Sequence, residues 1–196
     1  MVLLGVAVLT AAGAFAAREF YRSRAEAQPS QPVILTTPTT TPGGSTPPST
    51  SKPKPPGPRQ VAATSDAGSH PQYAEISQML QNYFDGINDK KYAVWRSAVT
   101  RARASDLPEE KWNSDYASTK DGNIVVYRIT ATQRGLSVLV TFTSTQKVTD
   151  APQELPSDCI DWSIVLPVVK EDGSWRIDSG AESRSPRHEK CGTQTS

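Results

Sequence analysis

The stretch from Asp158 to Ile177 constrains the fold of this chain more than any other. Apolar residues occupy alternate positions along it, which is the period of a strand with one buried face: Ile160, Trp162, Ile164, Leu166 and Val168. Asp172-Gly173 follows, and Asp-Gly between two such runs is the strongest short hairpin signal, because a type I′ turn needs positive φ at both central residues. Trp175 and Ile177 supply the buried face of the returning strand. The sequence therefore predicts a β-hairpin.

Three helices are predicted ahead of this hairpin. From Gln72 onward, apolar residues recur at helical spacing with polar residues between them: Tyr73, Ile76, Leu80, Tyr83, Phe84 and Ile87. A shorter second helix is marked by Tyr92, Trp95 and Val99. The run Asp106-Leu107-Pro108-Glu109 resembles a capping box with an early proline, so we expect a third short helix that ends near Tyr116.

Two more strands are predicted between the helices and the hairpin. The run from Ile124 to Ile129 is rich in β-branched residues, and the turn at Arg134-Gly135 follows it. Beyond that turn, Leu136, Val138, Val140 and Phe142 alternate with more polar residues, as in a half-buried antiparallel strand. With the hairpin, these strands form a meander. Pro167 should lie at an edge or a bulge, because proline cannot donate a hydrogen bond to a central ladder.

The N-terminal segment from Met1 to Ala17 is apolar and uncharged. A membrane span needs about 20 apolar residues, with roughly 17 as the lower limit, and a signal peptide needs a positive start that is missing here. Cleavage-like sites occur at Ala14-Phe15-Ala16 and Ala25-Glu26-Ala27. We expect an uncleaved single-pass anchor in the cell membrane with the domain outside the cytoplasm. The alternative is a signal segment that is cleaved to give a secreted protein.

Proline and threonine dominate the segment that follows. Ten of the 16 prolines lie between Pro29 and Pro58, and such a composition cannot bury a core. We expect residues 18–70 to be a disordered linker that holds a domain away from a surface. The alternatives are a proline-rich ligand for a partner domain and an O-glycosylated stalk. The expected organisation is thus an anchor or signal segment at 1–17, this linker, one domain at 71–180 and a polar tail at 181–196.

The charge and the cysteine count limit the compartment and the partners. Cys159 and Cys191 are the only cysteines, and one even pair fits a disulfide in an oxidising compartment. Two unrelated free thiols are the alternative. A formal net charge of +1 and a pI near 7.8 argue against nucleic acid as a partner, because its binders usually carry a basic stripe and a domain pI above roughly 9.

Several segments resemble the nuclear transport factor 2-like superfamily, in particular its exported actinobacterial members. They are Tyr83–Trp95, Asp115–Thr119, the strand ending Phe142-Thr143-Ser144, Cys159–Trp162 and Gly173–Asp178, within a resemblance that covers roughly residues 72 to 180. It implies an α+β fold with three N-terminal helices packed on a curved antiparallel sheet of four or more strands, forming a cone whose mouth can hold a pocket. The family includes isomerases, dehydratases and polyketide-cyclase-like proteins, and also many binding or accessory domains without catalysis.

Aromatic residues are the candidates for lining such a pocket. We single out Tyr83, Trp95, Tyr116, Tyr127 and Trp162, although aromatic residues of small domains more often fill the core or its rim. His70 and His188 fall in the linker and the tail, so a histidine base is not evident. Strand alternation points Asp161 and Asp178 away from the buried row.

We therefore expect a non-catalytic domain, tethered to the membrane through residues 1–17, that binds a protein partner or a small apolar ligand at the cell envelope. A homodimer through the sheet face is a further expectation. No phosphate-binding loop, metal cluster or nucleophile elbow is evident in the sequence, so no catalytic residue, metal or cofactor is expected. The alternative is a small isomerase or dehydratase, which should bury a carboxylate with a raised pKa in the cone.

Overall fold

The computed structural model describes residues 55–179 and 187–192. The predicted anchor at residues 1–17 and most of the predicted linker lie outside these ranges. Within them, no helix is both long enough and apolar enough to cross a membrane. The described chain is an α+β fold with a mixed sheet and several helices.

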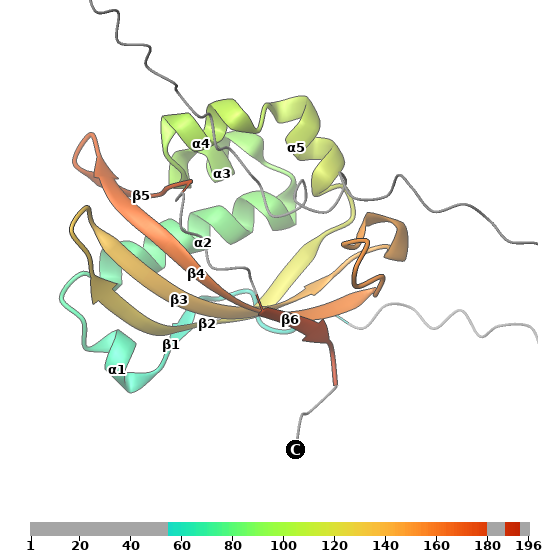
Figure 1. Ribbon diagram of the computed structural model, residues 1–196, viewed down its shortest axis with the longest axis horizontal. Helices are drawn as coiled ribbons and strands as arrows, with labels where there is room; N and C mark the ends of the chain where they lie inside the picture. The colour runs from blue at the N-terminus through green and yellow to red at the C-terminus, as the bar shows by residue number, and fades with distance from the viewer. Residues whose placement is uncertain (1–54, 180–186, 193–196) are drawn as a thin grey trace, which may run out of the picture.

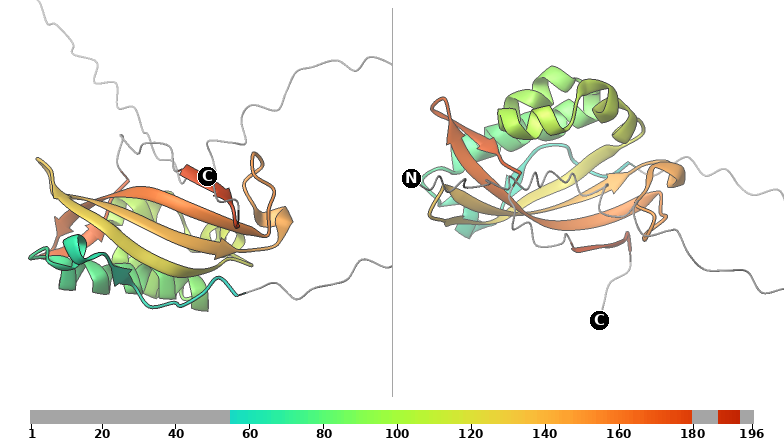
Figure 2. Two further views of the ribbon diagram at one scale, coloured as in Figure 1. Left: turned by 90° about the horizontal axis from the view of Figure 1, so that it is seen from below. Right: turned by 45° about the horizontal axis from the view of Figure 1, so that its top comes forward.

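Helices α2 to α5 lie together on one face of the sheet (Figures 1 and 2). Their bounds are Tyr73–Asp89 for α2, Tyr92–Ala98 for α3, Arg101–Asp106 for α4 and Glu109–Asp115 for α5. The first predicted helix is confirmed as α2, which buries Ile76, Leu80 and Phe84 completely. Its 3.6-residue apolar period thus determines the face that packs on the sheet.

The third predicted helix is confirmed as α5, but its expected cap needs a correction. The capping box does not form, because Asp106 ends α4 and Pro108 precedes α5 without a side-chain cap. The additional helix α4 begins after Thr100, whose hydroxyl accepts a hydrogen bond from the Arg103 amide at 3.3 Å. A threonine N-cap of this kind satisfies one of the free amides at a helix start.

The sheet confirms the predicted meander and extends it. Its strands are β1 (Ala62–Ala63), β2 (Lys120–Ala131), β3 (Leu136–Thr145), β4 (Cys159–Glu171), β5 (Ser174–Ile177) and β6 (Arg187–Lys190). They run in the order β1-β2-β3-β4-β5, with β6 paired to β4. All these pairs are antiparallel except β1 with β2, which is parallel. The sheet is therefore mixed rather than purely antiparallel.

The hairpin turn and the proline take their predicted places. Asp172 and Gly173 have φ values of 52° and 78°, as the two central residues of a type I′ turn require. On its second edge, β4 pairs with β6 from Ile160 to Ser163 and with β5 only from Val168 onward. Pro167 lies between these two stretches. No described strand pairs with β4 at this point on its second edge, so the missing N–H of the proline costs no hydrogen bond there.

The folded part begins earlier than the expected boundary at residue 71. Strand β1 and the short helix α1 (Ser65–Gly68) belong to the segment that we expected to be linker. The Asn123 amide also donates to the Pro58 carbonyl at 2.8 Å, which holds the chain against β2. These contacts are non-local, so composition alone did not reveal them.

The predicted disulfide is present and joins the end of the chain to the sheet. Cys159 and Cys191 are bonded, with Cα atoms 5.4 Å apart. The Cys191 amide also donates to the Cys159 carbonyl at 3.2 Å. Part of the predicted polar tail is therefore strand β6, held along the first residues of β4.

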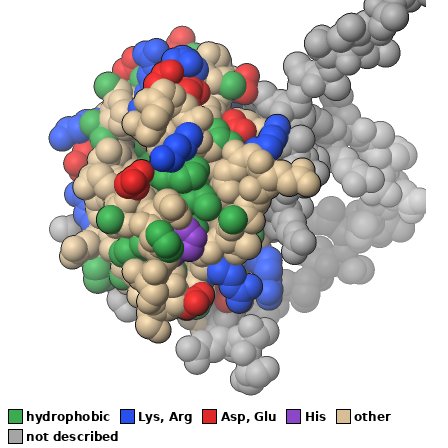
Figure 3. Space-filling model, turned by 90° about the vertical axis from the view of Figure 1, so that its left-hand side faces the viewer, with side chains coloured by type: hydrophobic (Ala, Val, Ile, Leu, Met, Phe, Trp, Pro, Cys, Tyr) green, Lys and Arg blue, Asp and Glu red, His purple; other side chains and the backbone are tan. Residues whose placement is uncertain are grey.

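Aromatic rings connect the helices to the sheet. Trp95 and Trp112 are completely buried, with ring centroids 5.7 Å apart, and Phe84 of α2 meets Phe142 of β3 at 5.0 Å. Helix α3 comes close to α2 because Gly86 has no side chain, and a Cβ built there would lie 2.5 Å from the Trp95 nitrogen. Figure 3 shows further hydrophobic side chains gathered at the left-hand end of the molecule in Figure 1.

Candidate functional site

A groove of about 410 Å³ crosses strands β2, β3, β4 and β6. This volume lies within the range of roughly 300 to 1,000 Å³ that is usual for small-molecule sites. The residues that line it are Asn123, Tyr127, Thr141, Phe142, Thr143, Asp161, Trp162, Ser163, Arg187, His188 and Glu189. Most of them carry polar side chains, so the groove differs in character from the aromatic core on the other side of the sheet.

Strand alternation determines which of these side chains face the groove. Phe142 packs on Phe84 of α2, so its neighbours Thr141 and Thr143 point to the opposite, open face of the sheet. The same face carries the residues that pair laterally with those threonines on β4, Asp161 and Ser163. Arg187 and Glu189 of β6 continue the row, because they pair with Ser163 and Asp161.

A β-bulge places Asn123 at one end of the groove. Between Gly122 and Val125, β2 advances by three residues, whereas β3 advances by only two, from Thr143 to Thr141. Asn123 lies in this interruption with a φ of 50°, in the left-handed region that asparagine tolerates better than most residues. Bulges are enriched next to active sites, where they re-aim a side chain.

A second bulge places Tyr127. Between Val126 and Arg128, β2 advances by two residues, while its partners on β3, Val140 and Leu139, are adjacent. Tyr127 is the extra residue, and its side chain is 48% exposed. Among the described residues, only Tyr127 and Val148 are large hydrophobic side chains with such exposure. Both groove residues from β2 therefore owe their positions to irregularities in the ladder.

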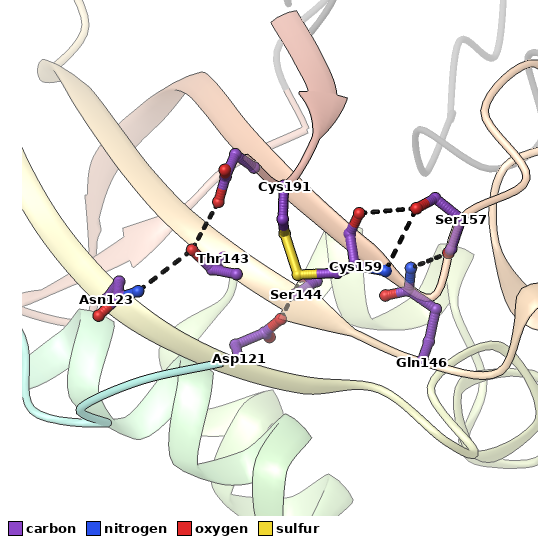
Figure 4. The surroundings of a disulfide bond; sticks show 9 residues. Asp121, Asn123, Thr143, Ser144, Gln146, Ser157, Cys159 and Cys191 are labelled. Carbon is purple, nitrogen blue, oxygen red and sulfur yellow. Dashed lines mark hydrogen bonds between the residues drawn. A yellow bond between two sulfur atoms is a disulfide. The ribbon is translucent and has the colours of Figure 1, made fainter. Parts of the chain in front are cut away.

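A hydrogen-bond chain orients the polar groups in the middle of the groove (Figure 4). The Asn123 Nδ2 donates to Thr143 Oγ1 at 3.4 Å, and Thr143 Oγ1 donates in turn to Asp161 Oδ1 at 2.6 Å. Each step has a defined direction, because the threonine hydroxyl accepts one bond and donates the other. Because Oδ1 of Asp161 accepts the bond from Thr143, the carboxylate group is held in place and its Oδ2 atom can accept a hydrogen bond from a ligand.

The disulfide holds the groove's outer wall in place. Strand β6 has four residues and, among the described strands, pairs with β4 alone. Cys191 follows β6 directly and is bonded to Cys159 at the start of β4. Arg187 and Glu189 are thereby fixed beside Ser163 and Asp161.

A separate polar cluster lies inside the domain, on the helix side of the sheet. Asp121 of β2 is only 2% exposed, and Ser144 Oγ donates to its Oδ1 at 2.5 Å. Burial raises the pKa of Asp121 to about 6, although the bond from Ser144 and the positive charge of Lys90 act in the opposite direction. The fold thus contains the kind of buried carboxylate that an acid–base enzyme requires.

Tyr116 interacts electrostatically with this carboxyl group. The pKa of Tyr116 is raised well above its usual value, chiefly by burial, with further contributions from Tyr83 and Asp121. Arg103 lowers that pKa in part, and its guanidinium lies 5.9 Å from the centre of the Tyr83 ring. A tyrosine hydroxyl that stays protonated can donate a hydrogen bond.

The C-terminus of α2 is latched to the start of β2 beside the cluster. The Asn88 side chain donates to the Asp121 carbonyl at 3.0 Å and accepts from the Asp121 amide at 2.6 Å. Lys90 and Lys120 donate their ammonium groups to the carbonyls of Ile87 and Asn88, which suits the negative end of the helix dipole. Burial and the nearby Lys120 lower the pKa of Lys90 to about 8.

The predicted pocket residues fall on both faces of the sheet. Tyr83 and Trp95 are core residues with 7% and 0% exposure, and Tyr116 packs against that core while partly exposed. Trp162 is also partly exposed, on the helix side beside Phe142. Tyr127 and Trp162 are both among the residues that line the groove, but of the two only Tyr127 lies on the open face of the sheet. The five residues therefore do not form one pocket.

Sequence reasoning missed Asp121, Asn123 and Thr143. The local signal was Asp121-Gly122-Asn123 at the start of a β-branched run, since a glycine or an asparagine in a strand suggests a bulge. The burial of Asp121 has no local signal, because its partners Asn88 and Ser144 lie 33 and 23 residues away.

Comparison with known proteins supplies no further assignment. The sequence matches no protein-family model and no curated protein. Within residues 55–179 and 187–192, no group of three or more histidine, cysteine or acidic side chains could hold a metal ion.

Proposed function

We propose that this chain is a non-catalytic binding domain, tethered to the cell membrane and held outside the cytoplasm, whose ligand or protein partner occupies the groove. The apolar segment at 1–17 is the proposed anchor, and the Pro/Thr-rich segment is the proposed spacer. The disulfide between Cys159 and Cys191 supports an oxidising compartment. The order of helices before an antiparallel meander supports a nuclear transport factor 2-like cone.

The pair of bulges in β2 carries this proposal. They interrupt an otherwise regular ladder twice within seven residues, from Gly122 to Arg128, and each interruption delivers a side chain to the same groove. Ladder hydrogen bonds are lost at a bulge, so an irregularity of this kind signals a use for the re-aimed side chain. The groove is polar, so we propose a polar ligand surface instead of the apolar one that we expected from the sequence.

Native mass spectrometry of the full chain, expressed in an oxidising compartment and kept in detergent, tests the proposal. We expect extra mass to remain bound to the wild type, to be lost in Y127A and to persist in V148A. Val148 is the matched control, because its side chain is 50% exposed and lies outside the groove. An empty wild-type protein, or equal retention by Y127A, would contradict the proposal. The charge states also show whether the chain forms the homodimer proposed for the sheet face.

The buried Asp121 favours a second candidate, an isomerase or dehydratase that uses this carboxylate inside the domain. Its raised pKa and its electrostatic interaction with Tyr116 are features of the acid–base sites that such enzymes use. A base must contact its substrate, however, and Asp121 is only 2% exposed, whereas the groove is open to solvent. Binding at the groove is therefore the first proposal.

Proton exchange distinguishes the two candidates. An enzyme of this type would exchange the α-protons of a β,γ-unsaturated ketone with deuterated water, and D121N would abolish that exchange. We expect the wild type and D121N to exchange at the same rate, equal to that of buffer. If the wild type exchanged these protons faster than both D121N and buffer, the second candidate, an enzyme that uses Asp121, would be established.

A further inference from the structure

We infer that the groove binds a neutral saccharide unit through Tyr127 and the polar row of Asn123, Thr143 and Asp161. The inference rests on the proposed function, because it names the ligand class of the same groove. It follows from three properties of the groove: an exposed ring, an ordered set of hydrogen-bonding groups, and an excess of negative charge.

The exposed ring is the first property. Tyr127 is 48% exposed on the open face of a sheet, in a groove of about 410 Å³. A half-exposed aromatic ring offers a flat apolar face with a polar hydroxyl at its edge. One face of a pyranose ring carries axial C–H groups, which make weak hydrogen bonds to such a surface. Ring and sugar therefore match in shape and in polarity.

The ordered polar groups are the second property. The chain from Asn123 through Thr143 to Asp161 has a fixed direction, so one Asp161 oxygen remains as an acceptor. A carboxylate can accept from two donors at once, and hydrogen bonds to an ionised acceptor are the stronger kind. Two vicinal hydroxyls of a sugar supply two such donors at adjacent positions. Ser163 and Arg187, which pair with each other on neighbouring strands, offer donors to the remaining hydroxyl oxygens.

The charge balance is the third property, and it excludes anionic ligands. Two acidic side chains, Asp161 and Glu189, face one basic side chain, Arg187, in the groove. A phosphate or a uronic acid would meet this net negative charge and be repelled, whereas a neutral polyol is not.

Calorimetric titration of the full chain in detergent tests the ligand class. The probes are three neutral hexasaccharides, built from glucose in β-1,4 linkage, glucose in α-1,4 linkage and N-acetylglucosamine in β-1,4 linkage, with an anionic hexagalacturonate for comparison. We expect at least one neutral probe to bind and the anionic probe to give no heat. Y127A and D161N should each weaken binding at least tenfold. V148A should bind like the wild type.

Other outcomes overturn the inference in distinguishable ways. Binding of hexagalacturonate alone, lost in Y127A, would overturn the neutral saccharide but leave the groove as a ligand site. If a neutral hexasaccharide bound Y127A and D161N as tightly as the wild type, the saccharide would bind outside the groove. No binding of any probe would also overturn the saccharide class, while retained mass lost in Y127A would still uphold the proposed function. D161N retains the shape of the side chain and an oxygen that can accept from Thr143, so unfolding should not obscure the result.

Discussion

The buried carboxyl group of Asp121 should make the stability of this domain fall as the pH rises from 4 to 7. Burial raises the pKa of this group from 3.8 to about 6, so between these values the folded state binds more protons than the unfolded state. Under proton linkage, stability then decreases with increasing pH. The stabilisation from the protonated form is fully present below about pH 4 and is lost as the pH passes 6.

The size of the effect follows from the shift. A raised pKa of about 6 against 3.8 is a difference of about 2 units, and each unit corresponds to about 1.4 kcal/mol. Asp121 should therefore reduce the free energy of unfolding by about 3 kcal/mol between pH 4 and pH 7. Its exposure of only 2% means that solvent screening reduces this value little.

Urea unfolding at several pH values, followed by tryptophan fluorescence under non-reducing conditions, measures this effect. Other groups also titrate, so the informative quantity is the difference between the wild type and D121N. Between pH 4 and pH 7, the free energy of unfolding of the wild type should fall by about 3 kcal/mol relative to that of D121N. The control D106N removes an exposed carboxyl group and should give a flat difference. If the difference in free energy of unfolding between the wild type and D121N did not change with pH, the raised pKa of Asp121 and the burial that causes it would be refuted.

Substitutions at three other places in the fold test the packing that positions the groove and the cluster. The double variant C159S/C191S opens a loop with a sequence separation of 32 and should lower the free energy of unfolding by roughly 3–4 kcal/mol on chain entropy, measured by urea unfolding; an unchanged midpoint would show that the bond does not constrain the fold. N88A leaves the buried amide and carbonyl of Asp121 without the side chain that now pairs with both, so we expect a loss of about 2–4 kcal/mol, whereas N88D should retain part of the stability by accepting from the amide. G86A should destabilise by about 1–3 kcal/mol because the new methyl group meets α3, although alanine would gain about 1 kcal/mol in an isolated helix; a higher melting temperature for G86A would refute the close helix contact.

Elements that are specified by a short stretch of sequence were predicted correctly. The apolar period of α2, the alternation along β4 and the turn at Asp172-Gly173 each extend over a few residues, and each produced the expected element. The disulfide was also predictable, because Cys159 and Cys191 have no other cysteine to pair with. Such features depend on periodicity and turn chemistry, which a single sequence displays directly.

Features that depend on tertiary contacts were not predictable. Strand β1 has only two residues and forms because β2 offers it an edge. The groove depends on two register shifts between β2 and β3, and register becomes visible only when both strands are in place. Tyr127 was identified as a candidate pocket residue. The alternation rule alone could not show that its side chain lies on the open face of the sheet, whereas Tyr83 and Trp95 pack on the face that the helices cover.

The proposed ligand site of this protein is the open sheet face at Tyr127. Photo-crosslinking in intact cells tests it most directly, with a benzophenone amino acid placed at position 127 in one variant of the full chain and at position 148 in another. Both sites are comparably exposed, at 48% and 50%, so a chance encounter should label them equally. We expect a discrete adduct from position 127 and none from position 148. Equal labelling, or no adduct from position 127, would contradict it.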